Sequence, residues 1–248
     1  MRMGTGRAAA PRRAVAALTA ILAAAATADA STFSIAPIRI EMDRGHQTGV
    51  VTLHNDGDAP VTIQVEAVTW SQAEGEDTYA ATRDLLVTPP VFVVRPKSDQ
   101  IVRVARRTAD SSAREKTYRL FFQEVPEIAP AGFNGLNVAL RIGVPVFVAA
   151  PAAAPSELRW QASWLADGML KVEATNSGLA HVQITDFEVA TADHAVIARV
   201  GGSRYLLAGG HASWTVMPSA ESDYRGALYI RGFSDRGVII ADVAVAAP

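Results

Sequence analysis

The stretch Leu136-Asn137-Val138-Ala139-Leu140-Arg141-Ile142 has an apolar side chain at every second position. A period of two puts those side chains on one face of a β-strand. Residues 130–135 precede the stretch as a turn-rich loop, and residues 151–155, Pro-Ala-Ala-Ala-Pro, follow it as a linker. The sequence therefore predicts that this strand closes a first domain. Two interpretations stay open: an ordinary half-buried core strand, or an edge strand that offers its apolar row to another protein. The row is Leu136, Val138, Leu140 and Ile142.

The first thirty residues have the pattern of a cleavable targeting segment. Four arginines precede an apolar run over residues 14–26, which is too short to span a bilayer, and Ala28-Asp29-Ala30 resembles a cleavage site. We expect the mature chain to begin at Ser31 and to be exported across the inner membrane. No later stretch reaches the roughly eighteen apolar residues of a membrane span, so we expect no stable membrane insertion.

Charge and cysteine content exclude several classes of function. Removing residues 1–30 takes four Arg and one Asp from 23 basic and 25 acidic residues, which leaves a net charge of −5. An acidic chain lacks the basic face that nucleic acid binding needs. The absence of cysteine excludes disulfides, thiol catalysis and thiolate metal sites. The remaining 218 residues suffice for two domains of about 100 residues that rely on their cores for stability.

The organisation of the chain is that of short strands separated by turns, which is typical of an all-β sandwich. Alternation over Phe33–Met42 shifts phase at Pro37, as in a strand that bends or changes sheet. Each half contains a strand, an Asn-x-Gly turn and another strand, at Asn55 and at Asn176, and we predict the turn at Asn55 as a β-hairpin. The predicted domains are residues 31–150 and 156–248. Further strands are predicted over 50–53, 61–68, 91–94, 100–104, 117–125, 170–176, 203–207, 213–216, 227–231 and 238–245.

A search for catalytic and metal-binding patterns finds none. No histidine has metal-ligand spacing to another, and Gly201-Gly202-Ser203-Arg204-Tyr205 lacks the second glycine of a nucleophile elbow. We therefore predict no catalytic, cofactor or metal site and no enzyme activity. A hydrolase with two carboxylates across a cleft stays an alternative, as does a secreted carbohydrate- or ligand-binding adhesin that uses exposed aromatic residues.

Two arginines interrupt apolar strands. Arg39 lies between Ile38 and Ile40, and Arg141 lies between Leu140 and Ile142. Each either points to solvent from the polar face of its strand, or lies in an interdomain cleft and holds a carboxylate in a forked pair.

In order and spacing, a set of short motifs resembles the periplasmic pilus-assembly chaperones of the chaperone–usher pathway, over nearly the whole mature chain. The motifs are Pro37-Ile38-Arg39, Asn55-Asp56-Gly57, Trp70-Ser71-Gln72, Thr88-Pro89-Pro90, Val102-Arg103-Val104, Tyr118-Arg119-Leu120, Glu124-Val125-Pro126, Asn176-Ser177-Gly178, His181 and Tyr205-Leu206-Leu207-Ala208-Gly209. The resemblance implies two immunoglobulin-like domains in a boomerang arrangement. It also implies a role in fimbrium biogenesis, in which the chaperone binds pilin subunits by donor-strand complementation and delivers them to an outer-membrane usher.

The resemblance also assigns residue roles. Arg39 falls where the family has a cleft arginine that anchors the carboxylate of the subunit, and the apolar row ending at Ile142 falls on the donor strand. The family's second anchor is a lysine, but residues 142–146 contain none. Arg141 is the nearest basic residue and the candidate replacement. The Trp70-Gln72 and Pro89-Pro90 patterns, together with the short loop before the donor strand, resemble the archaic branch.

When no subunit is bound, the predicted apolar row would favour aggregation of the free chain, because an exposed apolar strand edge can pair with another chain. We expect the free chain to cover this strand, either in a self-capping dimer or with the loop over residues 129–135.

Overall fold

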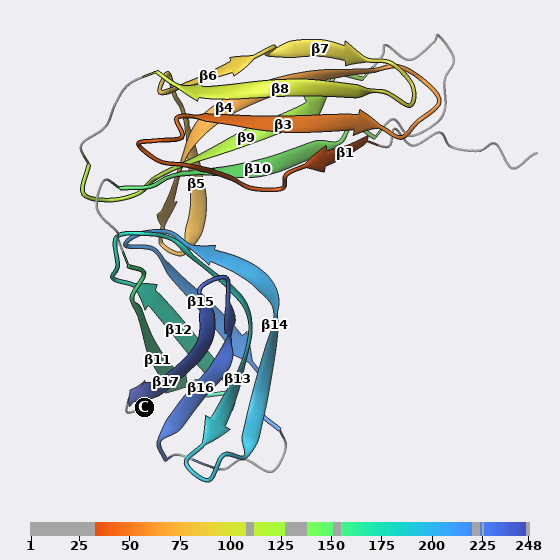
Figure 1. The fold of residues 1–248 in the computed structure, drawn as a ribbon. Coiled ribbons are helices and arrows are strands. Elements are labelled where there is room, and N and C mark those ends of the chain that lie inside the picture. The colour runs from red at the N-terminus through yellow and green to blue at the C-terminus, as the bar shows by residue number, and fades with distance from the viewer. Residues whose placement is uncertain are drawn as a thin grey trace, which may run out of the picture.

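The computed structural model describes residues 33–107, 112–126, 138–150, 155–219, 224 and 226–246. All regular elements in these residues are β-strands, so no helix among them could cross a membrane. Figure 1 shows two immunoglobulin-like β-sandwich units that meet at an angle like the arms of a boomerang. The predicted targeting segment, residues 1–30, lies outside the described residues.

The first unit consists of two packed sheets. One sheet has the order β1-β3-β8-β6, with β1 (Phe33–Ala36), β3 (Thr48–Asn55), β8 (Asp99–Arg106) and β6 (Leu85–Thr88). The other has the order β2-β10-β9-β4-β5, with β2 (Ile40–Met42), β10 (Arg141–Val148), β9 (Lys116–Glu124), β4 (Val61–Ala73) and β5 (Glu76–Ala81), and β7 (Val91–Val94) also pairs with β4. Alternate side chains of the strands fill the core between the sheets, as in β9, where Tyr118, Leu120 and Phe122 are buried.

The N-terminal strand changes sheet, as its shift in alternation predicts. β1 pairs antiparallel with β3, whereas β2, four residues later, pairs parallel with β10 in the other sheet. Phe33 and Ile40 are both buried in the same core, one from each sheet. The segment around Pro37 is therefore the crossing between the two sheets.

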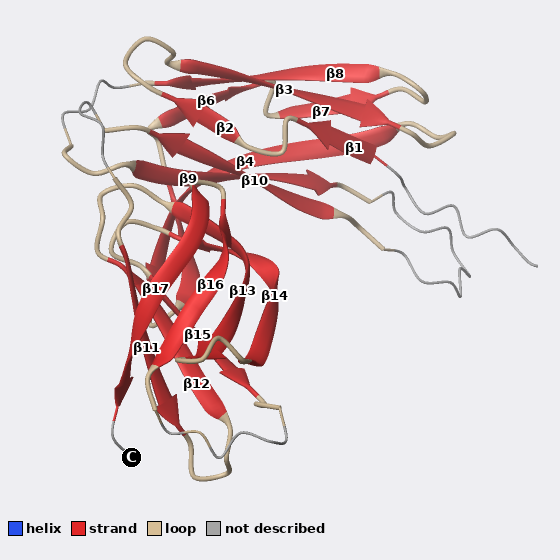
Figure 2. Ribbon diagram, turned by 60° about the horizontal axis from the view of Figure 1, so that its bottom comes forward, coloured by secondary structure: helices blue, strands red, loops and turns tan. Residues whose placement is uncertain are grey.

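The second unit has seven strands around a core of its own. Their order is β14 (Val196–Leu206), β13 (Val182–Thr191), β16 (Leu228–Ser234), β17 (Gly237–Ala246), β11 (Leu158–Trp164), β12 (Leu170–Asn176) and β15 (His211–Val216). Figure 2 shows that the ends of β13, β14 and β16 approach the first unit. Trp160, Phe187 and Trp214 form an aromatic cluster with ring centroids 5.0–6.0 Å apart. The scattered tryptophans thus serve largely as packing residues.

The hairpin predicted at Asn55 is wrong, and the matching turn at Asn176 does not form a hairpin either. β3 and β4 lie in different sheets, and β12 and β13 are not neighbours. Both asparagines are buried and act as corner supports. Asn55 Nδ2 donates to the carbonyls of Ala59 and Val94, and Asn176 Nδ2 donates to those of Ala180, Leu206 and Leu207. Asn-x-Gly marks where the chain reverses, whereas packing between distant strands decides which strands pair.

Candidate functional site

The strand predicted over residues 136–142 begins at Arg141 among the described residues, so the prediction is wrong for residues 138–140. Leu136 and Asn137 lie outside the described residues, and residues 138–140 have no regular structure. The partner strand β9 ends at Glu124, whose N–H donates to the Leu140 carbonyl at 2.9 Å. Beyond that bond no described strand is available to continue the ladder. The strand that does form, β10, extends to Val148.

The apolar row is not uniformly exposed, contrary to the expectation of a free apolar edge. Val138 is 59 % exposed, whereas Leu140 and Ile142 are half-buried against the core of the first unit. Val144 and Val146, which continue the same face, are fully buried. The row therefore leads out of the core, and Val138 is the member that is mostly in solvent among those described.

One side of β10 is open over its first half. Because Leu140 is hydrogen-bonded to β9, the alternation of an antiparallel ladder directs the backbone groups of Arg141, Gly143 and Pro145 to the opposite side. β2 covers that side from Val146 onward, and no described strand covers it before that residue. Pro145 has no N–H to donate, so the open edge ends there.

Arg39 lies at the junction of the two units. Its Nη1 donates to Asp235 Oδ2 of the second unit at 2.9 Å, and its Nη2 lies 3.1 Å from Glu41 Oε1. Desolvation lowers the pKa of Arg39, but Glu41 and Asp235 raise it by more, so the guanidinium stays charged. The side chain is 32 % exposed, and two carboxylates already balance its charge.

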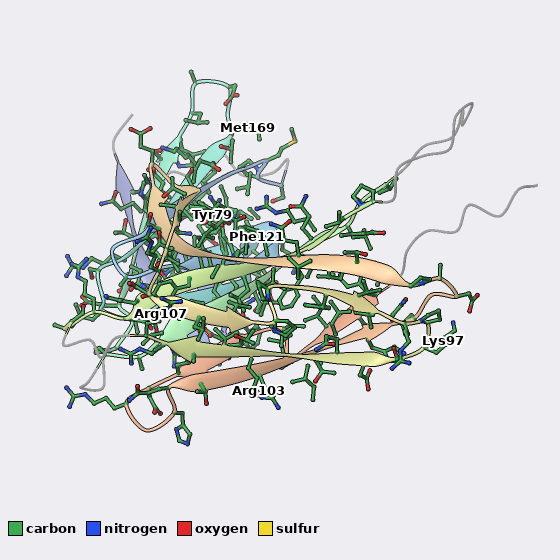
Figure 3. All side chains as sticks on the ribbon, turned by 90° about the horizontal axis from the view of Figure 1, so that it is seen from above. Tyr79, Lys97, Arg103, Arg107, Phe121 and Met169 are labelled. Atoms are coloured by element: carbon green, nitrogen blue, oxygen red, sulfur yellow. The ribbon has the colours of Figure 1, made fainter. Side chains whose placement is uncertain are left out.

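The structure does not bring Arg141 near Arg39. The guanidinium carbon of Arg141 lies over the ring of Phe121, 3.7 Å from its centroid, and Nη2 of Arg141 lies 3.8 Å from Glu66 Oε2. Arg141 is four residues from Pro145, roughly 13 Å along an extended strand. Figure 3 shows Phe121 beside Tyr79, and the two rings make an edge contact with centroids 5.2 Å apart.

Arg119 is the basic side chain that does lie near Arg39, and the sequence reasoning did not single it out. Arg119 pairs with Pro145 across β9 and β10, and Arg39 directly precedes Ile40, which pairs with Val146, the residue after Pro145. The three residues are therefore neighbours on the face that meets the second unit. The sequence does show that Arg119 is a basic residue at an outward position of β9. It does not show which residues lie beside Arg119, because that depends on the register between strands.

The environment of Arg119 leaves part of its hydrogen-bonding capacity unused. Its guanidinium carbon lies 4.0 Å from the ring centroid of Trp70, and its Nε is buried without a hydrogen-bond partner. Gly143 gives it room, because a Cβ at this glycine would come within 3.1 Å of Arg119 Cδ. Arg119 lines an interdomain pocket of about 400 Å³ together with Trp70, Arg204 and Tyr205.

Contacts between the units hold this pocket in shape. The Phe147 and His181 rings stack with centroids 3.4 Å apart, and His181 Nδ1 lies 2.7 Å from Glu115 Oε1. Gln72 Oε1 accepts from the Leu207 N–H at 3.0 Å, and Arg204 donates to the Gly75 carbonyl at 2.6 Å.

Tyr205 lies close to both Arg39 and Arg119. Burial raises the pKa of Tyr205, whereas Arg39 and Arg119 oppose the shift. The pocket also contains the carboxylates Glu76 and Asp77, and Arg39 lies outside its lining, on the other side of Tyr205. Within this site, Arg119 with its unpartnered Nε is the group that suits an incoming carboxylate.

Within the described part of the chain, no group of three or more His, Asp or Glu side chains has the arrangement of a metal site. His54 and His46 contact aspartates at exposed positions, and His181 belongs to the interdomain contact.

Comparison with known proteins gives a consistent picture. Residues 32–154 match the family model described as pili and flagellar-assembly chaperone, PapD N-terminal domain. A search of curated proteins finds no significant match.

Several solved structures share the fold. A chain of the CsuC–CsuE chaperone–tip adhesion subunit pre-assembly complex, from archaic chaperone-usher Csu pili of Acinetobacter baumannii, is similar with a TM-score of 0.66 and 17 % identity, covering 88 % of this chain and 100 % of that one. A chain of the Salmonella enterica SafA pilin–SafB chaperone complex is similar with a TM-score of 0.57 and 18 % identity, covering 86 % of this chain and 97 % of that one. The CupB2 chaperone of Pseudomonas aeruginosa is similar with a TM-score of 0.54 and 17 % identity, covering 86 % of this chain and 100 % of that one.

Proposed function

From the membership of this chain in the family of pili and flagellar-assembly chaperones, we propose that it is a periplasmic chaperone. It binds pilin subunits by donor-strand complementation and delivers them to an outer-membrane usher, without catalytic turnover. The observation that carries the proposal is the open edge of β10 beside an apolar row that leads out of the core. The neighbours that contain a pilin or a tip adhesion subunit support the same reading.

The physical role of β10 is to supply what an incomplete subunit lacks. A pilin that lacks its last strand has an apolar groove and unpaired backbone groups, and both promote aggregation. No described strand pairs with the N–H and carbonyl groups on the open side of Arg141 and Gly143, so these groups can pair with one edge of such a groove. Val138, with Leu136 before it and the exposed parts of Leu140 and Ile142, fills the groove. Each fully buried side chain of this size contributes roughly 1.5–3 kcal/mol.

The carboxylate anchor of the proposed site is Arg39 together with Arg119. Arg39 is already balanced by Asp235 and Glu41, whereas the buried Nε of Arg119 has no partner. A carboxylate that binds beside Tyr205, between Arg119 and Arg39, would gain most from Arg119 and would share Arg39 with Asp235. Arg141 stacks on Phe121 away from this pocket, so we assign it to the open edge and not to the anchor.

The remaining parts of the proposal concern export and the free state. We propose that residues 1–30 are removed on export and that the domains are 31–150 and 156–248. The Csu neighbour and the Trp70 and Pro89 motifs support the archaic branch. In the free chain, Val138 needs cover from a self-capping dimer or from the loop over residues 129–135, which lies outside the described residues.

The decisive experiment is purification of the exported chain from the periplasm of its own cells. We expect a one-to-one complex with a small pilin-like chain, identified by mass spectrometry. The Val138→Asp variant, purified in the same way, should come without that partner. Recovery of the wild-type chain alone, while its subunit accumulates intact elsewhere, would refute the proposal.

A further inference from the structure

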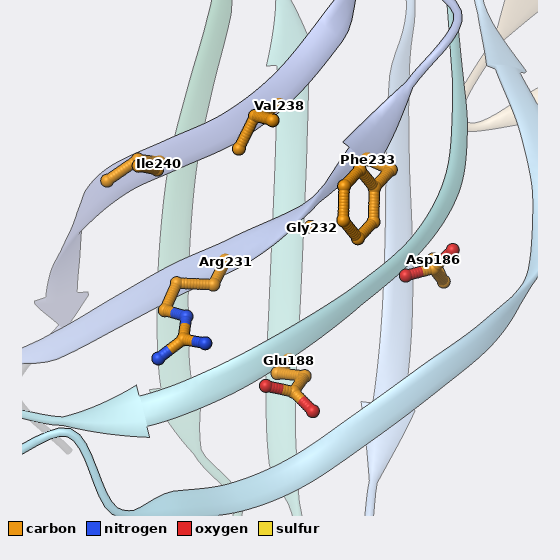
Figure 4. A pocket seen from close by; sticks show the side chains of 7 residues that line it. All are labelled: Asp186, Glu188, Arg231, Gly232, Phe233, Val238 and Ile240. Carbon is orange, nitrogen blue, oxygen red and sulfur yellow. The ribbon is translucent and has the colours of Figure 1, made fainter.

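A hollow on the outer face of the second unit has no part in the proposed function. It has a volume of about 380 Å³ and lies over β13, β16 and β17 (Figure 4). Its apolar side consists of Phe233, Val238 and Ile240, which are 56 %, 68 % and 79 % exposed. Phe233 pairs with Val238 across β16 and β17, so the three side chains are neighbours. Exposed apolar side chains gathered in this way mark an interaction surface.

Two charges beside this apolar trio, Asp186 and Arg231, have no ion pair within 4.0 Å among the described residues. In register across the sheet, Asp186 lies next to Phe233, and Glu188 lies next to Arg231. Glu188 is bridged to Arg199 at 2.8 Å. Asp186 accepts a hydrogen bond from the Thr185 hydroxyl at 3.2 Å, but among the described residues neither Asp186 nor Arg231 has an ion-pair partner within 4.0 Å. One free carboxylate and one free guanidinium thus flank the same hollow.

We propose that this face binds a second copy of the same chain about a two-fold axis. A two-fold contact uses one patch twice, so it needs both members of each charge pair on one surface. Facing two copies so that Asp186 of each meets Arg231 of the other places the axis close to Phe233. The rings of Phe233 and the side chains of Val238 from both copies then cover one another.

The charge pattern favours a second copy over an unrelated partner. A basic partner would neutralise Asp186 but would place a like charge opposite Arg231, and an acidic partner would do the reverse. In a two-fold dimer, Asp186 of each copy meets Arg231 of the other, so both charges are paired. Because the patch lies on the second unit, such a dimer leaves the open edge of β10 free in both copies. A patch on one small sheet buries less than a standard interface, so we expect a weak and reversible dimer.

Sedimentation velocity on the exported chain, from low micromolar to near-millimolar concentration, tests the proposal. The wild type should shift toward twice the monomer mass. Asp186→Arg and Arg231→Asp should each raise the dissociation constant at least about tenfold. An equimolar mixture of the two variants should restore dimerisation, because each wrong charge then meets its opposite at both contacts. Ile240→Glu tests the apolar part, and Asp58→Arg, an exposed carboxylate of the first unit, is the matched control.

The proposal fails if the wild type stays monomeric at the highest concentration, or if the variant mixture stays monomeric. Leu140→Glu separates this dimer from self-capping through β10. If that variant is monomeric while Asp186→Arg still dimerises, the contact is on the first unit. The outcome is independent of subunit capture, which is measured separately with the copurified subunit.

Discussion

Replacing Val138 by aspartate should abolish subunit binding while leaving the free chain folded. Val138 lies outside the strands and is 59 % exposed, so we expect the free energy of unfolding to change by about 0.5 kcal/mol or less. Full burial of a valine contributes about 1.5–3 kcal/mol, so covering the 59 % that is exposed contributes about 1–2 kcal/mol to the complex.

The carboxylate adds a larger and pH-dependent penalty. An ionised aspartate does not enter an apolar groove, so it must first take up a proton. With an ordinary pKa of about 3.9, protonation at pH 7 costs about 4 kcal/mol, and at pH 5 it costs about 1.5 kcal/mol. The total at pH 7 is about 5–6 kcal/mol, an affinity loss of about ten-thousandfold. Relative to the wild type, Val138→Asp should recover about a hundredfold at pH 5.

Competition binding with the copurified subunit at both pH values measures this effect, and thermal melting reports the fold of the free chain. Val138→Asn is the matched control, since it has the same shape but does not titrate. Val144→Asp, at a position that is 1 % exposed, should instead unfold the first unit. The donor-strand assignment fails if Val138→Asp binds as tightly as the wild type. The groove argument fails if the asparagine variant shows the same pH dependence.

Four further outcomes are expected. Arg39→Ala and Arg119→Ala should each weaken subunit capture by about 2–5 kcal/mol with a melting temperature near that of the wild type, whereas Arg141→Ala should have a smaller effect; a pull-down in which Arg141→Ala loses most would reverse the anchor assignment. Asn176→Ala removes hydrogen bonds to three buried carbonyls and should destabilise the second unit by about 3–5 kcal/mol, more than Asn55→Ala, which removes two, destabilises the first, as measured by urea unfolding; equal losses would contradict the argument from the number of hydrogen bonds, and no loss in either variant would contradict the corner role. The exported chain should begin at Ser31 by intact mass, and a mass that retains the arginine-rich start would mean an uncleaved anchor. Arg39→Ala should raise the pKa of Tyr205 further, seen as later ionisation in alkaline absorbance titration, because Arg39 opposes the effect of burial on that pKa.

The sequence predicts elements whose signal is local. The break in alternation at Pro37 marks the crossing between sheets, and the strand over residues 117–125 corresponds closely to β9. The turn at Asn55 was located correctly but assigned to the wrong kind of connection. A reversal of the chain leaves open whether the next strand pairs with the previous one or enters the opposite sheet, and only distant packing decides this.

The sequence predicts that Arg39 belongs to the candidate site, but it does not predict that Arg119 lies close to it. Arg39 is recognisable as a charge between apolar residues, and it does lie at the junction of the units. Arg119 is hidden because its importance comes from register, which places it beside Pro145 of β10 and close to Arg39, the residue just before β2. Val138 is exposed whereas Leu140 and Ile142 are half-buried, and this difference depends on where β9 ends. Alternation in the sequence does not reveal that end.

The pairing of β2 with β10 sets the order in which the first unit can be completed. Ile40 meets Val146, a contact between residues 106 positions apart in sequence. Closing so long a loop is slow compared with forming neighbouring strand pairs, and contacts of high sequence separation lengthen folding times. When the exported chain emerges with its N-terminal end first, the residues of β2 stay without this partner until almost all of the first unit has emerged. The strand that we propose for capturing subunits is then the last to be laid into its sheet, so a chain unable to close its first unit also lacks its capturing edge.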